Sequence, residues 1–158
     1  MTKRFKHSLG IRHLVCGSCN GCEHEMNALS GPAYDITAQG WDMVASPRHA
    51  DVVTVTGPMT EAMRDAAAST LAATPSPRVI VAIGDCAVGD GPWSGVGSAG
   101  SGAGPELGAR VSVRGCPPSP QDIKKGLHEA AHVLDEGDGT SIRAGRGEHE
   151  PEGAKAKR

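Results

Sequence analysis

A chain of 158 residues is long enough for one domain with a modest hydrophobic core, and its formal net charge of -2 excludes the broad basic face of a nucleic-acid-binding protein. No stretch approaches the roughly 18 unbroken apolar residues that a membrane span needs, and the opening decapeptide MTKRFKHSLG has no apolar signal-peptide core. We therefore expect a cytoplasmic protein. Five cysteines in a reducing compartment indicate metal binding or redox chemistry rather than disulfides.

In chain order, the predicted elements begin with a basic arm and continue with a set of strands. Residues 1–13 contain lysine and arginine but no acidic side chain, which predicts a solvated N-terminal arm. Three later segments are short, continuous and rich in β-branched residues, at 51–56, 78–83 and 110–113. Such runs are typical of buried strands in a parallel sheet. Residues 36–46 predict a weaker strand, because Gly40 interrupts it.

Two helical patterns accompany these strands. Residues 57–74 lie between the first two strands, and Pro58 is placed for the first helical turn. This segment carries an apolar stripe at helical spacing, made of Ala62, Met63, Ala66, Ala67, Thr70 and Leu71. After the last strand, Ser119 predicts an N-cap and Pro120 a first helical residue. The face that follows contains Ile123, Leu127, Ala130, Ala131 and Leu134. The order predicts a βαβ unit and a second helix that covers the sheet.

Two segments lack such patterns. The glycine-rich residues 84–104 predict a loop, and the GxGxxG match within it neither follows a strand directly nor opens a helix, so it does not indicate a dinucleotide site. Residues 135–158 consist mainly of glycine, proline and charged side chains, with Ile142 as the one large aliphatic residue. This composition predicts a disordered tail. The predicted domain therefore spans residues 14–134.

The five cysteines fall into two sets. Cys16, Cys19 and Cys22 lie within the stretch VCGSCNGCEHEM, whereas Cys86 and Cys116 come just beyond the predicted strands 78–83 and 110–113. Residues that follow parallel strands meet at one edge of the sheet, so we expect Cys86 and Cys116 to be neighbours although they lie far apart in the sequence. Cys19 and Cys22 face the same edge if a helix beginning near Cys22 packs there. The pattern predicts four thiolates around one point.

Four thiolates suit either tetrahedral zinc or a [4Fe-4S] cluster. Structural zinc sites usually take two short paired-cysteine motifs, whereas Cys86 and Cys116 each stand alone. Pro117, directly after Cys116, resembles the Cys-Pro that closes ferredoxin-type ligand runs. A thioredoxin-like dithiol at Cys19 and Cys22 leaves the other two cysteines unexplained. The context favours an iron-sulfur cluster, and a zinc-stabilised interaction module is the alternative.

Four separated segments, in order, carry a family resemblance over about residues 14–134: CGSCNGCEHEM, SPRHADVVTVTGPMTEAMRDA, GDC and GCPPSP. They resemble the small iron-sulfur subunit that complex I, where it is called the B subunit, shares with energy-converting membrane-bound [NiFe] hydrogenases, including formate hydrogenlyase. The resemblance implies a flavodoxin-like α/β domain that carries one [4Fe-4S] cluster on Cys19, Cys22, Cys86 and Cys116. It also implies an electron-transfer subunit of an oxidoreductase complex, with no turnover in isolation.

The same resemblance implies partners and a location. The partners are a large catalytic subunit, either [NiFe]-hydrogenase-like or like its counterpart in complex I, a ferredoxin-like iron-sulfur subunit and, indirectly, membrane subunits. The complex would hold the chain peripherally on the cytoplasmic side of the cell membrane. Complex I places two cysteines side by side at the first motif, whereas this chain separates Cys19 and Cys22 by Asn20 and Gly21. This departure favours the hydrogenase branch, and an NADH-quinone oxidoreductase subunit is the alternative.

Further side chains near the motifs are less defined by the pattern. Cys16 matches an extra cysteine of formate-hydrogenlyase-like members, yet four ligands suffice, so we expect it beside the cluster and not on it. Glu25 resembles an acidic family residue and is either a proton relay or a carboxylate favoured by the helix dipole. Asp85 places a carboxylate beside Cys86, which would lower the reduction potential of a cluster. Three histidines without a partner pattern are expected at the surface, namely His13, His128 and His132.

Overall fold

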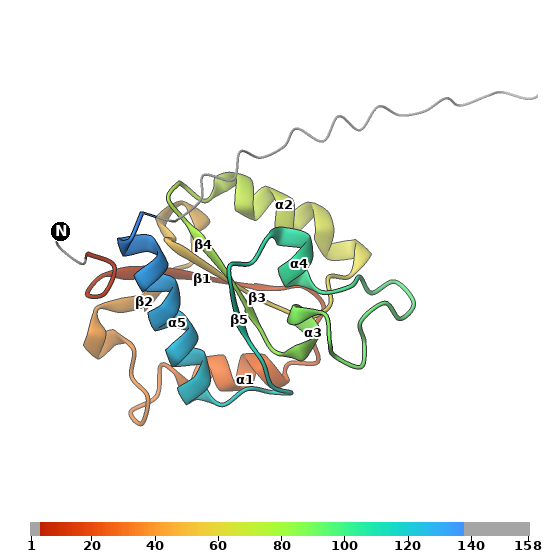
Figure 1. Cartoon of the computed structure of the whole chain (residues 1–158), viewed down its shortest axis with the longest axis horizontal. Coiled ribbons are helices and arrows are strands. Elements are labelled where there is room, and N and C mark those ends of the chain that lie inside the picture. Colours follow the sequence, from red (N-terminus) through yellow and green to blue (C-terminus); the bar gives the residue numbers. More distant parts are fainter. Residues whose placement is uncertain (1–3, 138–158) are drawn as a thin grey trace, which may run out of the picture.

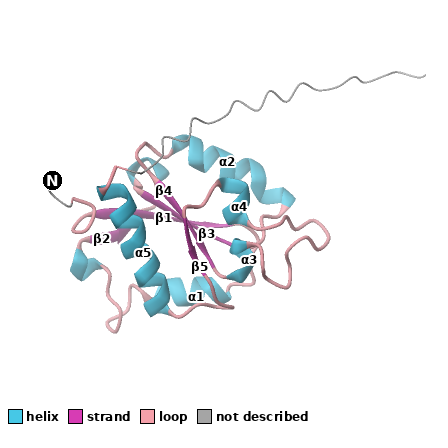
Figure 2. Ribbon diagram, viewed as in Figure 1, coloured by secondary structure: helices cyan, strands magenta, loops and turns pink. Residues whose placement is uncertain are grey.

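The computed structural model describes residues 4–137. Its strands and α-helices follow one another in the order β1 (Leu9–Val15), α1 (Gly21–Ala28), β2 (Trp41–Met43), β3 (Val52–Thr56), α2 (Arg64–Ala73), β4 (Val79–Ile83), α3 (Asp85–Val88), α4 (Ala103–Leu107), β5 (Val111–Val113) and α5 (Pro120–Asp135). Short 3-10 turns occur at Thr37–Gln39, Pro47–His49 and Glu61–Met63. Figure 1 shows these elements in chain order, and Figure 2 separates helices from strands by colour.

The five strands form one parallel sheet in the order β2-β1-β3-β4-β5. This is the doubly wound order of flavodoxin-like folds, in which the chain reverses direction across the sheet between β1 and β3. Helices α1 and α5 pack on one face, and α2, α3 and α4 pack on the other (Figure 1). The predicted α/β class, flavodoxin-like with a mostly parallel sheet and flanking helices, is confirmed.

The central strands are apolar because both faces of the sheet are covered. Every residue of β3 and β4 is buried, which explains why neither strand has a charged residue and why both are rich in β-branched side chains, including the buried Thr54 and Thr56. The predicted C-terminal helix is confirmed as α5. The Ser119 hydroxyl accepts a hydrogen bond from the backbone N–H of Asp122, Pro120 is the first helical residue, and all five predicted apolar positions are buried.

Two predictions about the middle of the chain are wrong in detail. The helix expected over 57–74 begins only at Arg64, and within α2 only Ala67 of the predicted stripe is fully buried. The carbonyl groups of Pro58 and Met59 instead accept hydrogen bonds from the backbone N–H groups of Gly102 (3.2 Å) and Gly100 (2.7 Å). This pairing joins the segment to the glycine-rich loop, and the φ of 64° at Met59 is left-handed, so the helix does not include it. That loop is also not wholly irregular, because it contains α3 and the start of α4.

The N-terminal boundary differs from the expectation as well. The predicted limit of the basic arm, at residue 13, falls inside β1, which pairs with both β2 and β3. The sequence LGIRHLV did not predict this strand, because Arg12 and His13 interrupt its apolar pattern. Both residues nevertheless lie half-buried in the sheet. The weaker strand expected over 36–46 is confirmed at residues 41–43 only. Residues 138–158 lie outside the described residues, so the disordered tail stays a prediction.

Candidate functional site

A cavity of about 90 Å³ lies at the carboxyl edge of the sheet, next to the point where the strand order reverses. Residues that follow four different strands line it, including Ser18 after β1 and Pro58 after β3. Among the lining residues are four cysteines, Cys19, Cys22, Cys86 and Cys116. The fold therefore brings the four predicted cysteines to one place, where open α/β sheets bind their ligands.

Cys19 and Cys22 lie on the turn that leads from β1 into α1. Gly17 has a φ of 98° and Asn20 a φ of 69°, so two left-handed residues turn the chain sharply between strand and helix. Asn20 is the N-cap of α1 and Cys22 lies in its first turn. Cys19 is exposed and Cys22 is half-buried. The turn between β1 and α1, formed by one short segment, therefore positions both Cys19 and Cys22.

Cys86 and Cys116 come from the ends of the neighbouring strands β4 and β5. The turns that carry them are joined by backbone hydrogen bonds, from Gly84 N–H to the Val113 carbonyl (2.8 Å) and from Asp85 N–H to the Gly115 carbonyl (2.9 Å). The side chain of Asp85 adds a third link, because its Oδ1 accepts a hydrogen bond from Gly115 N–H at 2.8 Å. Cys86 is half-buried and Cys116 is exposed. The sheet itself therefore holds this pair together.

The four thiols share an electrostatic environment. Burial raises the pKa of Cys22 to about 12, and the neighbouring Glu23 carboxylate and the other three thiols act in the same direction. Burial also raises the pKa of Cys86, although a hydrogen bond from the backbone of Trp93 counters part of that effect. Negative charge is therefore costly here without a cation, so binding of a positive centre would be coupled to release of thiol protons.

Glycine residues keep the space beside the thiols open. A Cβ atom at Gly84 would lie 2.5 Å from the Cys22 sulfur, and one at Gly91 would lie 2.5 Å from the Cys86 sulfur. Within residues 4–137, no group of three or more histidine, cysteine or carboxylate side chains is arranged to hold a metal ion. The four soft sulfur donors and the glycine-lined cavity nevertheless fit a thiolate-bound cluster.

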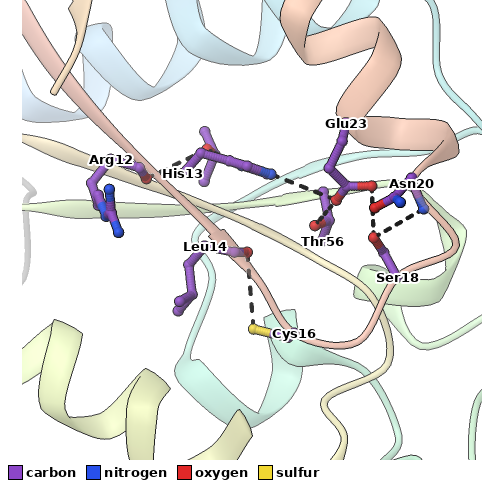
Figure 3. A network of polar contacts seen from close by, with 9 residues as sticks. Arg12, His13, Leu14, Cys16, Ser18, Asn20, Glu23 and Thr56 are labelled. Atoms are coloured by element: carbon purple, nitrogen blue, oxygen red, sulfur yellow. Dashed lines mark hydrogen bonds and ion pairs between the residues drawn. The ribbon is translucent and has the colours of Figure 1, made fainter. Parts of the chain in front are cut away.

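The residue next to Cys22 makes polar contacts that the sequence did not indicate. Glu23 accepts hydrogen bonds from Ser18 Oγ (2.6 Å) and Thr56 Oγ1, and its carboxylate lies 3.6 Å from His13 Nε2 (Figure 3). Burial alone would raise the pKa of Glu23, but the hydrogen bonds from Ser18 and Thr56 outweigh it and the net pKa is lowered. The sequence shows Glu23 directly after Cys22, but it does not indicate the contact of Glu23 with the distant Thr56.

His13 is not a surface residue, contrary to the prediction. Its side chain is 16% exposed, and its Nδ1 lies 2.9 Å from Thr54 Oγ1. Burial lowers the pKa of His13, and the nearby Glu23 carboxylate counters part of this effect. The prediction missed this because β1, which buries His13, was not foreseen.

The other two residues singled out in this motif lie apart from the cavity lining. Cys16 is completely buried beside Val53 and Val55 on the face covered by α2, where burial, followed by the charge of Glu106, raises its pKa to about 11. Glu25 is half-exposed, and its side chain makes no hydrogen bond or ion pair within the described part of the chain. Neither residue lines the cavity, so neither is placed to act as a direct fifth donor to it.

Comparison with known proteins identifies the family. Residues 19–130, which include all four cavity cysteines, match the family described as NADH ubiquinone oxidoreductase, 20 kDa subunit. The chain belongs to this family. Formate hydrogenlyase subunit 7 of Escherichia coli is 32% identical over 136 residues, which cover 86% of this chain and 53% of that protein. This chain thus spans about half the length of that relative.

Two further relatives represent both branches of the family. A probable membrane-bound hydrogenase subunit of Pyrococcus furiosus is 36% identical over 134 residues, covering 85% of this chain and 80% of that protein. The B subunit of NADH-quinone oxidoreductase from Clostridium beijerinckii is 36% identical over 107 residues, covering 67% of this chain and 63% of that protein. Sequence identity is therefore similar toward a hydrogenase subunit and a quinone-reducing enzyme subunit.

Solved structures agree on the fold. A chain of the archaeal membrane-bound sulfane sulfur reductase superposes with a TM-score of 0.70 at 26% identity, covering 84% of this chain and 73% of that chain. A chain of an NAD+-reducing [NiFe]-hydrogenase gives a TM-score of 0.61 at 14% identity, covering 79% and 92%, which supports the shared fold alone. Among residues 4–137, no helix has the length and apolarity required to cross a membrane.

Proposed function

We propose that this chain is an electron-transfer subunit that holds one [4Fe-4S] cluster on Cys19, Cys22, Cys86 and Cys116. It passes electrons between ferredoxin-like subunits and a large catalytic subunit of a membrane-associated oxidoreductase complex. The observation that carries the proposal is the convergence of the four thiols on one cavity at the carboxyl edge of the sheet. When bound, the cluster supplies one-electron redox chemistry.

The residues around the cavity perform three tasks in this proposal. The four cysteines supply thiolates, and Gly84 leaves the space that a side chain would fill. Asp85 ties the two distant cysteine turns together and places a negative charge next to Cys86, which favours the more oxidised state of a cluster. Because Cys19 and Cys116 are exposed, this side of the chain is the one that an electron-exchanging partner subunit covers.

The hydrogenase branch is the preferred setting. The Cys19-x-x-Cys22 spacing differs from the adjacent cysteines of complex I, and two relatives named above are a formate hydrogenlyase subunit and a probable membrane-bound hydrogenase subunit. In this setting the chain sits peripherally on the cytoplasmic side of the membrane. The similar identity to an NADH-quinone oxidoreductase subunit supports a quinone-reducing complex as the second candidate.

Metal analysis of the native complex, purified without oxygen, tests the proposal. We expect four irons and four labile sulfides assigned to this chain, in line with one [4Fe-4S] cluster. Bound zinc without labile sulfide would instead identify a zinc-stabilised interaction module. Nickel in the complex together with hydrogen evolution from a low-potential dye supports the hydrogenase setting, whereas a nickel-free complex that reduces quinone replaces it with the second candidate.

A further inference from the structure

Glu23 follows Cys22 directly in the sequence, yet it does not line the cavity. We propose that Glu23 is a positioning residue that holds Cys19 and Cys22 at the spacing that a bound cluster requires. It acts by joining the turn before Cys19 to the end of β3. The inference rests on the proposed cluster site, and it assigns a role to a side chain of this chain that makes no contact with the cluster itself.

The geometry of the Glu23 carboxylate supports this role. One carboxylate oxygen accepts a hydrogen bond from Ser18 Oγ at 2.6 Å, and the other accepts one from Thr56 Oγ1 and lies 3.6 Å from His13 Nε2 (Figure 3). These partners belong to three separate segments, namely the β1–α1 turn, the end of β3 and the middle of β1. One side chain therefore joins α1 to the neighbouring strands β1 and β3.

The bond to Ser18 encloses both cysteines. Ser18 precedes Cys19 and Glu23 follows Cys22, so their hydrogen bond closes a short ring around the Cys-x-x-Cys turn. Ser18 Oγ also accepts a hydrogen bond from the backbone N–H of Asn20 at 3.3 Å. Because α1 has no side-chain cap of its own, the ring replaces the cap that usually fixes a helix start. The turn between the two ligands is thus held by Ser18 and Glu23.

The bond to Thr56 joins this turn to the part of the cavity lining that follows β3. Thr56 ends β3 and is completely buried, and the next two residues, Gly57 and Pro58, line the cavity. Without the Glu23 carboxylate, the hydroxyl of Thr56 would lose its acceptor in a place that water does not reach. Removal of Glu23 therefore loosens the cysteine turn and also leaves a buried hydroxyl unpaired.

Glu25 provides a matched control for Glu23. Both glutamates belong to α1 and have the same side chain, Glu23 in the first turn and Glu25 two residues further along. The Glu25 side chain makes no hydrogen bond or ion pair in the part of the chain that the structure describes. A comparison of the two positions therefore separates the bonds of Glu23 from the loss of a glutamate side chain on α1.

The test uses the full chain, purified without oxygen with its cluster bound, and measures the rate of iron release to a chelator together with the EPR spectrum of the reduced cluster. We expect Glu23→Ala to release iron at least about tenfold faster than wild type and to alter the EPR line shape, as is usual for residues that orient ligands. Glu25→Ala should stay within about twofold and leave the EPR spectrum unchanged. Glu23→Gln should recover part of the loss, because its amide oxygen still accepts a hydrogen bond.

A second variant keeps the proposal testable if the Glu23→Ala chain fails to fold. Thr56→Val keeps the shape of the buried side chain but removes one donor, so we expect iron release to accelerate several-fold. In the double variant Glu23→Ala/Thr56→Val, release should be no faster than in Glu23→Ala alone, because both changes break the same bond. Wild-type release rates in both Glu23→Gln and Thr56→Val would refute the positioning role and leave the cluster proposal intact. A wild-type chain without iron and sulfide would instead refute the cluster proposal.

Discussion

The cavity is built from two pairs of cysteines that the chain brings together in different ways. Cys19 and Cys22 belong to one turn, whereas Cys86 and Cys116 are distant in the sequence and meet because β4 and β5 are neighbouring parallel strands. In spite of this difference, each pair contains one exposed and one half-buried thiol. Local sequence and sheet topology can therefore produce equivalent halves of one site.

The two halves differ in what holds them. Backbone hydrogen bonds between the turns that carry Cys86 and Cys116 fix the distant pair, and the Asp85 side chain adds one link to a backbone N–H group. Backbone hydrogen bonds tie the segment of the local pair to the end of β3 only at Cys16, from Cys16 N–H to the Thr56 carbonyl (2.8 Å) and from Thr60 N–H to the Cys16 carbonyl (3.0 Å). Beyond Cys16, the side-chain contacts of Glu23 with Ser18 and Thr56 hold the turn. We therefore expect the local pair to be sensitive to side-chain substitutions, and the distant pair to changes of backbone conformation.

The largest effect should come from loss of any one of the four proposed ligands. Serine in place of Cys19, Cys22, Cys86 or Cys116 should abolish the EPR signal of the reduced cluster, because a hard hydroxyl is a poor substitute for a thiolate. Cys16→Ser should retain the signal, since Cys16 is buried away from the cavity. Loss of the signal in Cys16→Ser with retention in Cys86→Ser would overturn the assignment, because it would make Cys16 and not Cys86 a ligand.

A backbone change in the distant half should have the next largest effect. In Gly84→Ala the new methyl group would lie 2.5 Å from the Cys22 sulfur, at a residue with a φ of 89°. We expect iron content after anaerobic purification to fall at least about tenfold, because a non-glycine residue there is both strained and in collision. Gly95→Ala is the control, since Gly95 has a φ of 71° but no atom near its Cβ position. If the iron content fell equally in both variants, backbone strain alone would explain the loss, without the collision at Cys22.

The sequence predicted most of the fold and the four cysteines of the cavity for a physical reason. Runs such as residues 51–56 and 78–83 are buried on both sides, so their composition alone identifies them as strands. The carboxyl ends of the strands predicted at 78–83 and 110–113 then locate Cys86 and Cys116. β1 escaped prediction because Arg12 and His13 interrupt its apolar pattern, and the contact of His13 with Thr54 exists only in the folded chain. Glu23 escaped for the same reason, since Thr56 lies 33 residues away.

The side-chain link in the distant half should matter less than its backbone. Asp85→Ala removes the acceptor for Gly115 N–H, and we expect iron release to a chelator to accelerate by a factor of about three to ten. Asp90→Ala is the matched control, because Asp90 pairs with Arg114 in an exposed ion pair that contributes little stability. Its release rate should stay within about twofold of wild type. If Asp85→Ala exceeded Glu23→Ala, the distant half would be the more dependent on side chains.

The smallest effect concerns acid sensitivity, which we assign to the local half. Burial lowers the pKa of His13 below the 6.5 of an unperturbed histidine, so the folded chain binds fewer protons there than the unfolded chain. His13 therefore contributes stability above pH 6.5 that is lost as the pH falls through its lowered value. The lowered pKa of Glu23, from 4.5, acts only in more acidic solution than the range from about pH 8 to about pH 5.5. Burial also lowers the pKa of His128, so the part due to His13 is obtained by comparing wild type with a His13 variant.

The midpoint of thermal unfolding, measured across this range on the anaerobic protein, tests the assignment. Wild type should lose a few degrees more than His13→Gln between about pH 8 and about pH 5.5, because the neutral amide removes the titrating group. His132→Gln changes an imidazole whose side chain is 58% exposed and should follow wild type. In the distant half the partner of Asp85 is a backbone N–H that does not titrate in this range, so no equivalent loss is expected there. An acid loss in His13→Gln as large as in wild type would remove this distinction between the halves.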